Sequence, residues 1–205
     1  MGHVAVERSE RTDQTGTGLD THTLRASNTG RCVEDPLIEG EVAYNLGAGK
    51  IRWPGWRTVD SDTKADVTCD LRRLTLPDAS ADRLVAIHVL EHLYPWETKP
   101  MLLEWKRVLK VGGQLVLELP NMQAVLNHIF LRMKKGQAPS PGFSWLPIWG
   151  DPKYQRPEMM HKWGYFPSDV LALLTDCGFG SVELVPARYH FPDRDMRVEA
   201  RKETA

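Results

Sequence analysis

The sequence predicts an α/β protein built on a mostly parallel sheet, and three observations support this class. First, apolar runs of strand length alternate with segments whose apolar residues repeat at helical spacing. Second, residues 83–88 (RLVAIH) are a nearly continuous apolar run, typical of a central strand in a sheet covered on both faces. Third, a glycine turn at 47–49 directly follows a predicted strand, so that its bare backbone can approach a ligand.

The expected elements follow this alternation. Strands are predicted at residues 42–46, 57–60, 65–69, 83–88, 114–119, 181–185 and 196–201. Helices are predicted at 100–110, 122–133 and 167–174. Gly112 and Gly113 are expected to end the first of these helices. Strands alternating with helices predict parallel pairing with right-handed crossovers.

The connection between the first two strands departs from the usual pattern. Pro54 and Gly55 are a turn signal, so the first crossover helix is expected to be absent or shortened to about one turn. Asp60 follows Gly47 by 13 residues, whereas the dinucleotide fingerprint places its acid about 20 residues on and adds a third glycine. The glycine turn alone therefore does not indicate a dinucleotide site, and an ordinary tight turn remains the alternative.

Composition limits the classes of partner. The chain has 205 residues, a net charge of −1 and a hydrophobic fraction of 41%, which is enough for one domain with appendages and gives no bulk attraction to nucleic acid or anionic membranes. No apolar run is long enough to span a membrane, and no secretory signal is visible, so a cytoplasmic location is expected. The three cysteines, with no CxxC spacing, argue against a disulfide framework and a cysteine-based zinc site.

Two segments stand apart from the alternation. Residues 1–39 are polar and lack an apolar period, which predicts a flexible leader ahead of a single domain at 40–205. Residues 136–166 combine Pro and Gly with many aromatic residues, which favours a lid over a substrate. The alternative is a loop whose aromatic side chains fill the edge of the core.

The candidate ligand-binding residues fall at strand ends. Gly47, Asp60, Asp70 and His88 each lie at or just after the end of a predicted strand, and ligands of open α/β sheets bind outside the carboxyl ends of strands. A carboxylate placed there can accept two hydrogen bonds from a ribose diol. These positions therefore predict a nucleoside-like ligand at one edge of the sheet.

Several segments together resemble the class I S-adenosylmethionine-dependent methyltransferases, in particular the small bacterial methyltransferase-11-like type. The resemblance spans about residues 41–202 and rests on six pieces in order: NLGAG at 45–49, TVDSD at 58–62, CDLRRLTLPDASADRLVAIHVLEHL at 69–93, RVLKVGGQLVLELP at 107–120, LLTDCGF at 173–179 and MRVEARK at 196–202. The resemblance implies a Rossmann-like, mostly parallel sheet with helices on both faces and an antiparallel C-terminal strand.

The resemblance also implies S-adenosyl-L-methionine as the cofactor and assigns residues to it. Gly47, Ala48 and Gly49 would line the methionine and ribose part, and Asp60 would hold the ribose hydroxyls. At the adenine end, Asp70 would face the amino group and Leu71 would border the ring. His88 would lie beside the sulfonium.

Two other functional classes are alternatives to a methyltransferase. Residues 88–92 spell HxxEH, a zinc peptidase motif when both histidines lie one turn apart on a helix. His88, however, closes a strand pattern, so no metal ligand is expected and the ordinary alternative is that Glu91 and His92 pack or cap a short helix. A binding module that keeps the cofactor pocket without turnover is the third class.

The acceptor is expected to be a small polar or glycosidic molecule methylated on a hydroxyl, by analogy with the family and because aromatic faces in residues 136–166 can stack on a ring. The limited basic content of that segment does not suggest a nucleic-acid partner. His161 is the leading candidate base and His88 the second, since an imidazole can accept a hydroxyl proton near neutral pH. For each histidine alone, a surface or core role is the alternative.

Overall fold

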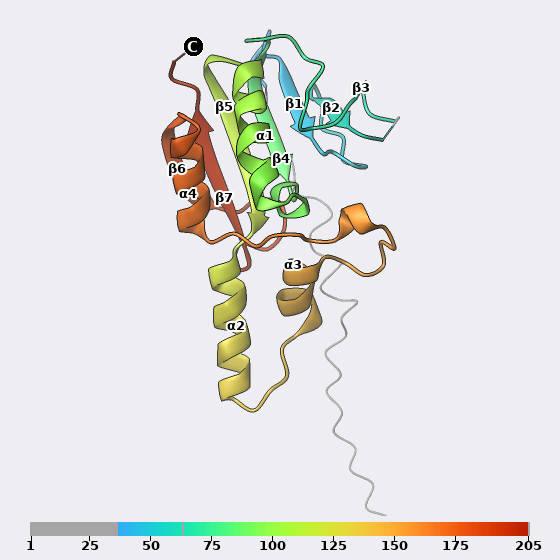
Figure 1. The fold of residues 1–205 in the computed structure, drawn as a ribbon, viewed down its shortest axis with the longest axis vertical. Coiled ribbons are helices and arrows are strands. Elements are labelled where there is room, and N and C mark those ends of the chain that lie inside the picture. The colour runs from blue at the N-terminus through green and yellow to red at the C-terminus, as the bar shows by residue number, and fades with distance from the viewer. Residues whose placement is uncertain (1–36, 63, 205) are drawn as a thin grey trace, which may run out of the picture. The chain divides into compact units, whose positions relative to one another are not determined.

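Seven strands form one sheet in the order β3-β2-β1-β4-β5-β7-β6 in the computed structural model, which describes residues 37–62 and 64–204 (Figure 1). The described residues fall in one compact unit, Arg31–Ala205. The strands are β1 Ala43–Leu46, β2 Arg57–Asp60, β3 Val67–Thr68, β4 Ala81–Ile87, β5 Leu109–Pro120, β6 Gly180–Pro186 and β7 Asp195–Arg201. The helices are α1 Pro95–Val108, α2 Met122–Lys134, α3 Leu146–Trp149 and α4 Pro167–Asp176.

Strand directions confirm the predicted fold class. The pairs β2–β3, β1–β2, β1–β4 and β4–β5 are parallel, while β7 runs antiparallel to both β5 and β6. The sheet is therefore mostly parallel with an antiparallel C-terminal strand. Because the parallel strands share one direction, the carboxyl ends of β1, β2, β3, β4 and β5 meet at a single edge.

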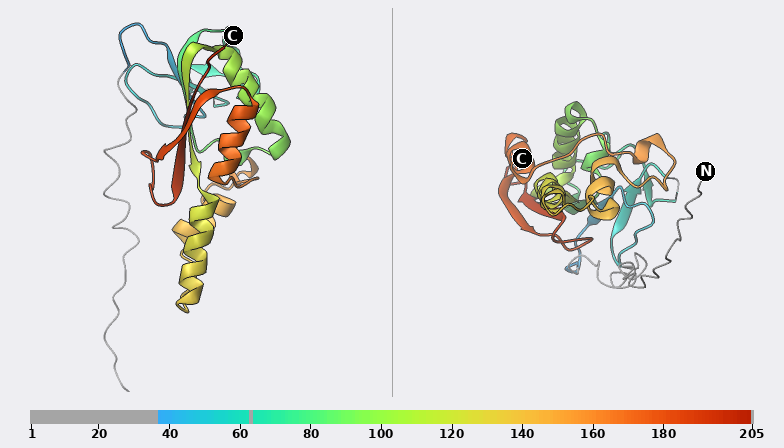
Figure 2. Two further views of the ribbon diagram at one scale, coloured as in Figure 1. Left: turned by 90° about the vertical axis from the view of Figure 1, so that its left-hand side faces the viewer. Right: turned by 90° about the horizontal axis from the view of Figure 1, so that it is seen from below.

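Helical cover lies on one face of the sheet rather than on both. Helices α1 and α4 pack on the same side (Figure 2), where Trp105 and Leu174 join a large core with Leu84 and Leu115. On the opposite side, among the described residues, loop side chains cover the strands: Trp53, Trp56 and Tyr189 pack against Val85 and Val116. Among the described residues, helices α1 and α4 therefore cover one face of the sheet, and loop side chains cover the other.

The absence of a helix between β1 and β2 explains why loop side chains cover the second face of the sheet. Residues 47–56 join β1 to β2 by turns without a helix, as the Pro54-Gly55 signal predicted. Their two tryptophans, with ring centroids 5.5 Å apart, fill the space that a crossover helix would cover. A ten-residue loop therefore supplies the apolar surface for the second face.

Helix α1 begins earlier and ends earlier than predicted. Pro95 occupies its first turn, and the Glu97 carboxylate accepts a hydrogen bond of 3.0 Å from the Tyr94 backbone N–H, so the chain is capped there. Pro100 lies inside the helix and removes one backbone hydrogen bond without ending it. At the other end β5 starts at Leu109, so Gly112 and Gly113 lie within the strand and do not terminate the helix.

Short helical turns occupy much of the segment 136–166. They comprise a π-helical turn at Pro141–Trp145, α3, and a 3-10 turn at Pro157–Met159. Tyr165 is only 5% exposed and its hydroxyl lies 2.7 Å from Thr98 Oγ1, so this aromatic does fill the core edge. Trp145, Trp149 and Trp163 are 43%, 58% and 50% exposed and remain available to a ligand.

Three further predictions concern the leader, membrane-spanning helices and the cysteines. The predicted leader at 1–39 lies almost entirely outside the described residues. Within the described part, no helix has the length and apolar character needed to cross a membrane. Cys69 and Cys177 are free thiols there.

Trp105 anchors α1 to the sheet, and its truncation tests this packing. The side chain is fully buried and its indole N–H donates a 2.8 Å hydrogen bond to the Leu71 carbonyl. We expect Trp105→Ala to lower the free energy of unfolding by about 3–5 kcal/mol, because it leaves a cavity and an unpaired carbonyl. Urea denaturation measures the change. Leu103→Ala, on the exposed side of the same helix, is the control and should change stability little; equal losses would contradict this packing.

Candidate active site

The predicted ligand-binding residues do meet at the carboxyl edge of the sheet. Gly47 directly follows β1, Asp60 ends β2, Asp70 lies two residues beyond β3 and His88 directly follows β4. Backbone bonds hold the neighbouring ends together, from Gly47 N to Val59 O at 2.8 Å and from Cys69 N to Asp60 O at 3.0 Å.

The glycine turn requires glycine at its first position. Gly47 has a φ of +67°, and a Cβ there would lie 2.6 Å from Val89 Cγ2 and 3.4 Å from Leu71 Cδ1. Gly49 has a φ of +51°, and its N–H donates a 2.8 Å hydrogen bond to Asp60 Oδ2. Leu71 and the acid predicted to hold the ribose thus contact this turn directly. Ala48, in contrast, is 2% exposed, which leaves mainly its backbone for a ligand.

The two strand-end acids differ in their surroundings. Asp60 also accepts a 3.2 Å hydrogen bond from Asp62 N through Oδ1, so it shapes both flanking loops. Asp70 forms a bidentate pair with Arg72, which in turn lies 2.7 Å from Glu97. The Arg72 hydrogen bonds lower the pKa of Asp70 against the opposing effect of partial burial. A ligand amino group at Asp70 would therefore have to share this carboxylate with Arg72.

His88 is a cation held between two carboxylates. It has a φ of +54°, its Nδ1 lies 2.7 Å from Glu91 Oε1, and its Nε2 lies 3.5 Å from Asp195 Oδ2. Burial alone would lower the pKa of His88, but the charge of Glu91 and the hydrogen bonds to Asp195 and Glu91 raise it to about 10. At neutral pH this imidazole is protonated and has no lone pair with which to accept a proton.

His161 lies beside His92 and Glu91, on a segment that hydrogen bonds attach to the short helix Leu90–His92. The Glu91 carbonyl accepts from Lys162 N at 2.7 Å, and the two imidazole rings are 4.8 Å apart edge to face. His161 Nδ1–H donates to the Pro147 carbonyl at 2.8 Å, which leaves the lone pair of the neutral ring on Nε2. Burial lowers the pKa of His161, so the neutral form is favoured.

Sequence patterns missed the C-terminal contribution to the site. Asp195 pairs with Pro120 across the β5–β7 ladder, which places it at the same edge as His88. It is 3% exposed and bound to Arg194 at 2.8 Å. The His190 ring lies 4.5 Å from that of His88, and burial together with the charge of His88 lowers the pKa of His190 to about 4. The only local sequence signal for these residues was Asp195, an acid directly before the predicted strand at 196–201.

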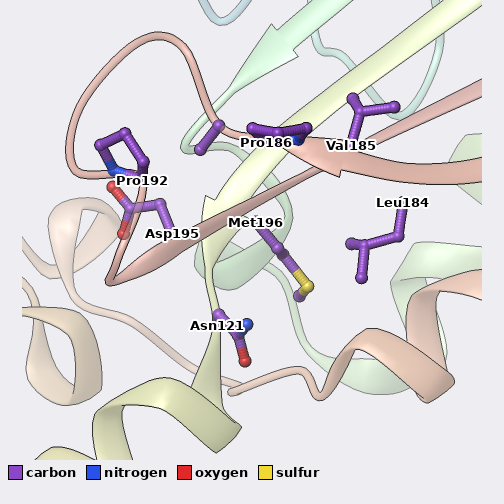
Figure 3. A pocket seen from close by; sticks show the side chains of 8 residues that line it. Asn121, Leu184, Val185, Pro186, Pro192, Asp195 and Met196 are labelled. Atoms are coloured by element: carbon purple, nitrogen blue, oxygen red, sulfur yellow. The ribbon is translucent and has the colours of Figure 1, made fainter.

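Two hollows adjoin the sheet. One of about 280 Å³ lies between the ends of β5, β6 and β7, and Figure 3 shows Asp195, Asn121 and Met196 at its wall. It therefore shares Asp195 with the cluster around His88. Another, of about 490 Å³, is lined by residues that include Asp82, Arg83, Gly112 and Gly113. That hollow lies at the opposite edge, where β4 begins, and is remote from the strand-end acids.

In open α/β proteins, a glycine turn and acids at the carboxyl ends of parallel strands lie where ligands bind. Residues 54–117 match the family model described as a methyltransferase domain. A search of curated proteins found no match.

Solved structures share this fold at low sequence identity. An S-adenosylmethionine-dependent methyltransferase of Methanosarcina mazei is 19% identical with a TM-score of 0.57, covering 82% of this chain and 95% of its own. One from Archaeoglobus fulgidus is 17% identical with a TM-score of 0.52, covering 79% and 86%. A chain from the Haloferax volcanii complex of the Trm112 methyltransferase activator with a methyltransferase is 13% identical with a TM-score of 0.55, covering 90% and 88%.

These findings confirm the resemblance stated from the sequence. Residues 54–117 thus match a methyltransferase domain, and the fold is that of solved S-adenosylmethionine-dependent methyltransferases.

Gly47 provides a test of the close approach at the turn. We expect Gly47→Ala to be about 1–3 kcal/mol less stable to unfolding than Gly40→Ala, because only the former places its methyl group against Val89. Both positions have a positive φ, so the comparison removes backbone strain common to the two. Chemical denaturation of both variants gives the difference, and equal stability would refute the close packing.

Proposed function

We propose that this chain transfers the methyl group of S-adenosyl-L-methionine to a hydroxyl oxygen of a small polar or glycosidic acceptor. One observation supports the proposal: beside the short helix that follows β4, the buried carboxylate of Glu91 lies near His161, whose Nε2 lone pair is not used by the Nδ1–H bond to Pro147. Such a group is suited to a hydroxyl, which must lose a proton during methylation.

The cofactor is proposed to bind along the carboxyl ends of β1, β2 and β3. Gly47, Ala48 and Gly49 would contact its methionine and ribose through backbone groups, and Asp60 would hold the ribose hydroxyls. Leu71, which lies against the glycine turn, and Asp70 would contact the adenine. This arrangement would bring the sulfonium towards the end of β4.

The reaction itself needs little covalent chemistry from the protein. A lone pair of the acceptor oxygen attacks the methyl carbon, the carbon–sulfur bond breaks, and its electron pair stays on sulfur. The products are the methyl ether, S-adenosylhomocysteine and one proton. Alignment of oxygen, carbon and sulfur supplies much of the acceleration.

His161 is proposed as the group that assists the hydroxyl, and His88 as a positioning group. A free Nε2 can take the hydroxyl proton itself or bind an ion that polarises the hydroxyl, and His161 keeps this lone pair. His88 is protonated by its two carboxylate neighbours, so the initial assignment of a base role to His88 is revised. Its cationic ring fixes Glu91 instead.

The exposed tryptophans favour an acceptor with a flat or ring-shaped apolar face. Trp145, Trp149 and Trp163 lie on the segment that also carries His161. Aromatic faces stack on sugar and aromatic rings without requiring charge. A small ring-bearing hydroxyl compound is therefore the proposed substrate class.

Asp60 tests the cofactor site. We expect S-adenosylmethionine to bind with micromolar affinity, roughly −8 kcal/mol. Loss of a charge-assisted hydrogen bond in Asp60→Ala should weaken binding by about 10–100-fold. Isothermal titration calorimetry measures both. Asp62→Ala, which removes a nearby carboxylate bound to Lys64 N, is the matched control and should bind normally; unchanged affinity in Asp60→Ala would rule out the assignment.

His161 tests the catalytic assignment. Methyl-labelled cofactor is incubated with the protein and fractionated hydroxyl compounds until a labelled product is identified. We expect His161→Ala to reduce turnover on that acceptor by about 10²–10⁴-fold while cofactor affinity is retained. His128→Ala, a histidine of α2 bound to Ser140, is the control. Full turnover in His161→Ala would show that positioning alone suffices, and cofactor binding without any labelled product would favour a non-catalytic module.

A further inference from the structure

We propose that Glu91, His92 and His161 form a binding site for a divalent transition-metal ion. One ligand atom from each of the three side chains lies within 4.8 Å of the other two. Two imidazole nitrogens and one carboxylate oxygen are a donor set found in catalytic zinc sites, where a fourth position stays open. The part of this inference that concerns catalysis rests on the methyl transfer proposed above.

One oxygen of the Glu91 carboxylate is buried without a hydrogen-bond partner among the described residues, which favours a bound cation. Glu91 is 1% exposed, and its Oε1 lies 2.7 Å from His88 Nδ1. Its Oε2 is buried and has no hydrogen-bond partner among the described residues. A buried carboxylate oxygen without a partner is costly, whereas a bound cation would satisfy it.

The two histidines are oriented as metal ligands usually are. His92 donates its Nδ1–H to the Met160 carbonyl at 3.2 Å, and His161 donates its Nδ1–H to the Pro147 carbonyl at 2.8 Å. A carbonyl can only accept, so in each ring Nδ1 carries the donated proton and Nε2 is the nitrogen that can bind an ion. Metal-binding histidines typically donate their other ring N–H to a carbonyl or carboxylate in this way, which fixes tautomer and ring direction.

A neighbouring side chain orients Glu91, as the two carbonyls orient the histidines. His88 holds Oε1 and leaves Oε2 for the ion, so each of the three proposed ligands has its own orienting partner. Ligand atoms around a tetrahedral zinc ion lie about 3.3 Å apart, given metal–ligand distances near 2 Å. Because the donors lie within 4.8 Å of one another, they need to draw together by up to about 1.5 Å on binding.

A second group of possible ligands, His88, His190 and Asp195, is a poorer site. Arg194 binds both carboxylate oxygens of Asp195, each at 2.8 Å, so an ion there would face a guanidinium. His88 Nδ1 is already engaged with Glu91. The geometry thus assigns the ion to the side of Glu91 that faces His92 and His161.

An ion at this position would act on the acceptor. A hydroxyl bound in the open coordination position is polarised and loses its proton to water more readily. Its oxygen then attacks the methyl carbon, and the electron pair of the broken carbon–sulfur bond stays on sulfur. His161 assists by holding the ion rather than by accepting the proton. This inference replaces the expectation from sequence that the chain has no metal ligand.

The test uses the full chain without an affinity tag, stripped with a chelator and dialysed against Zn²⁺, with bound metal measured by mass spectrometry and affinity by competition calorimetry. We expect one Zn²⁺ per chain. His92→Ala and His161→Ala should each weaken binding by at least about 100-fold, because removal of a ligand costs no less than removal of an orienting partner. Circular dichroism confirms that each variant folds.

Matched variants separate this site from its neighbours. His128→Ala and His190→Ala should keep full Zn²⁺ affinity, since neither residue belongs to the proposed ligand set. Sub-stoichiometric binding, or binding that His190→Ala abolishes and His92→Ala does not, would overturn the inference. Metal binding is measured without acceptor, so its result does not depend on whether the proposed methyl transfer is correct. Undiminished methyl transfer by the chelator-treated enzyme would refute the role of the ion while supporting the function.

Discussion

Glu91 joins three segments that are far apart in the sequence, through its carboxylate and its backbone carbonyl. Its side chain binds His88 at the end of β4, and its backbone carbonyl accepts from Lys162 and Trp163. Through His88 the connection extends to Asp195 at the start of β7. Glu91 therefore connects the segment that carries His161 to the end of β4, although it lies on a helix of only three residues.

The cost of burying these charges explains why they occur as a network. A buried carboxylate alone would be protonated or excluded, and a buried imidazolium alone would lose its proton. Here His88 lies between Glu91 and Asp195, and Arg194 supplies the second cation. Burial raises the pKa of Asp195, but the hydrogen bonds from His88 and Arg194 lower it well below its usual range. The network is thus balanced in charge and holds its members in fixed directions.

Much of the fold and part of the site could be predicted from local patterns. The apolar run before His88 predicted a central strand, and the glycine turn and Asp60 were correctly placed at one edge because parallel strands share their direction. Asp195 and His190 could not be found in this way. Their approach to His88 depends on the antiparallel register of β7 against β5, and register is set by side-chain packing between segments about 80 residues apart.

The differences in helix boundaries and cover have similar causes. The helix was predicted to start at residue 100, but it begins five residues earlier, at Pro95, where the Glu97 carboxylate caps the Tyr94 N–H; this cap outweighs the hydrogen bond lost at Pro100. The second face of the sheet is covered by Trp53 and Trp56 because a wide indole ring can replace part of a helix surface. Neither outcome follows from periodicity alone, since both depend on what packs against the segment.

The HxxEH motif shows how one set of residues can carry different chemistry. A helical zinc motif needs both histidines one turn apart on the same face. The positive φ of His88 ends the strand with a sharp turn, and the following helix includes only Leu90, Glu91 and His92. The motif is therefore divided: His88 faces Asp195, whereas His92 faces His161 from a different part of the chain. The motif could be read from the local sequence, but which side chains lie together depends on the fold. His92 lies beside His161 and not beside His88, so the proposed ion site combines residues from two distant parts of the chain.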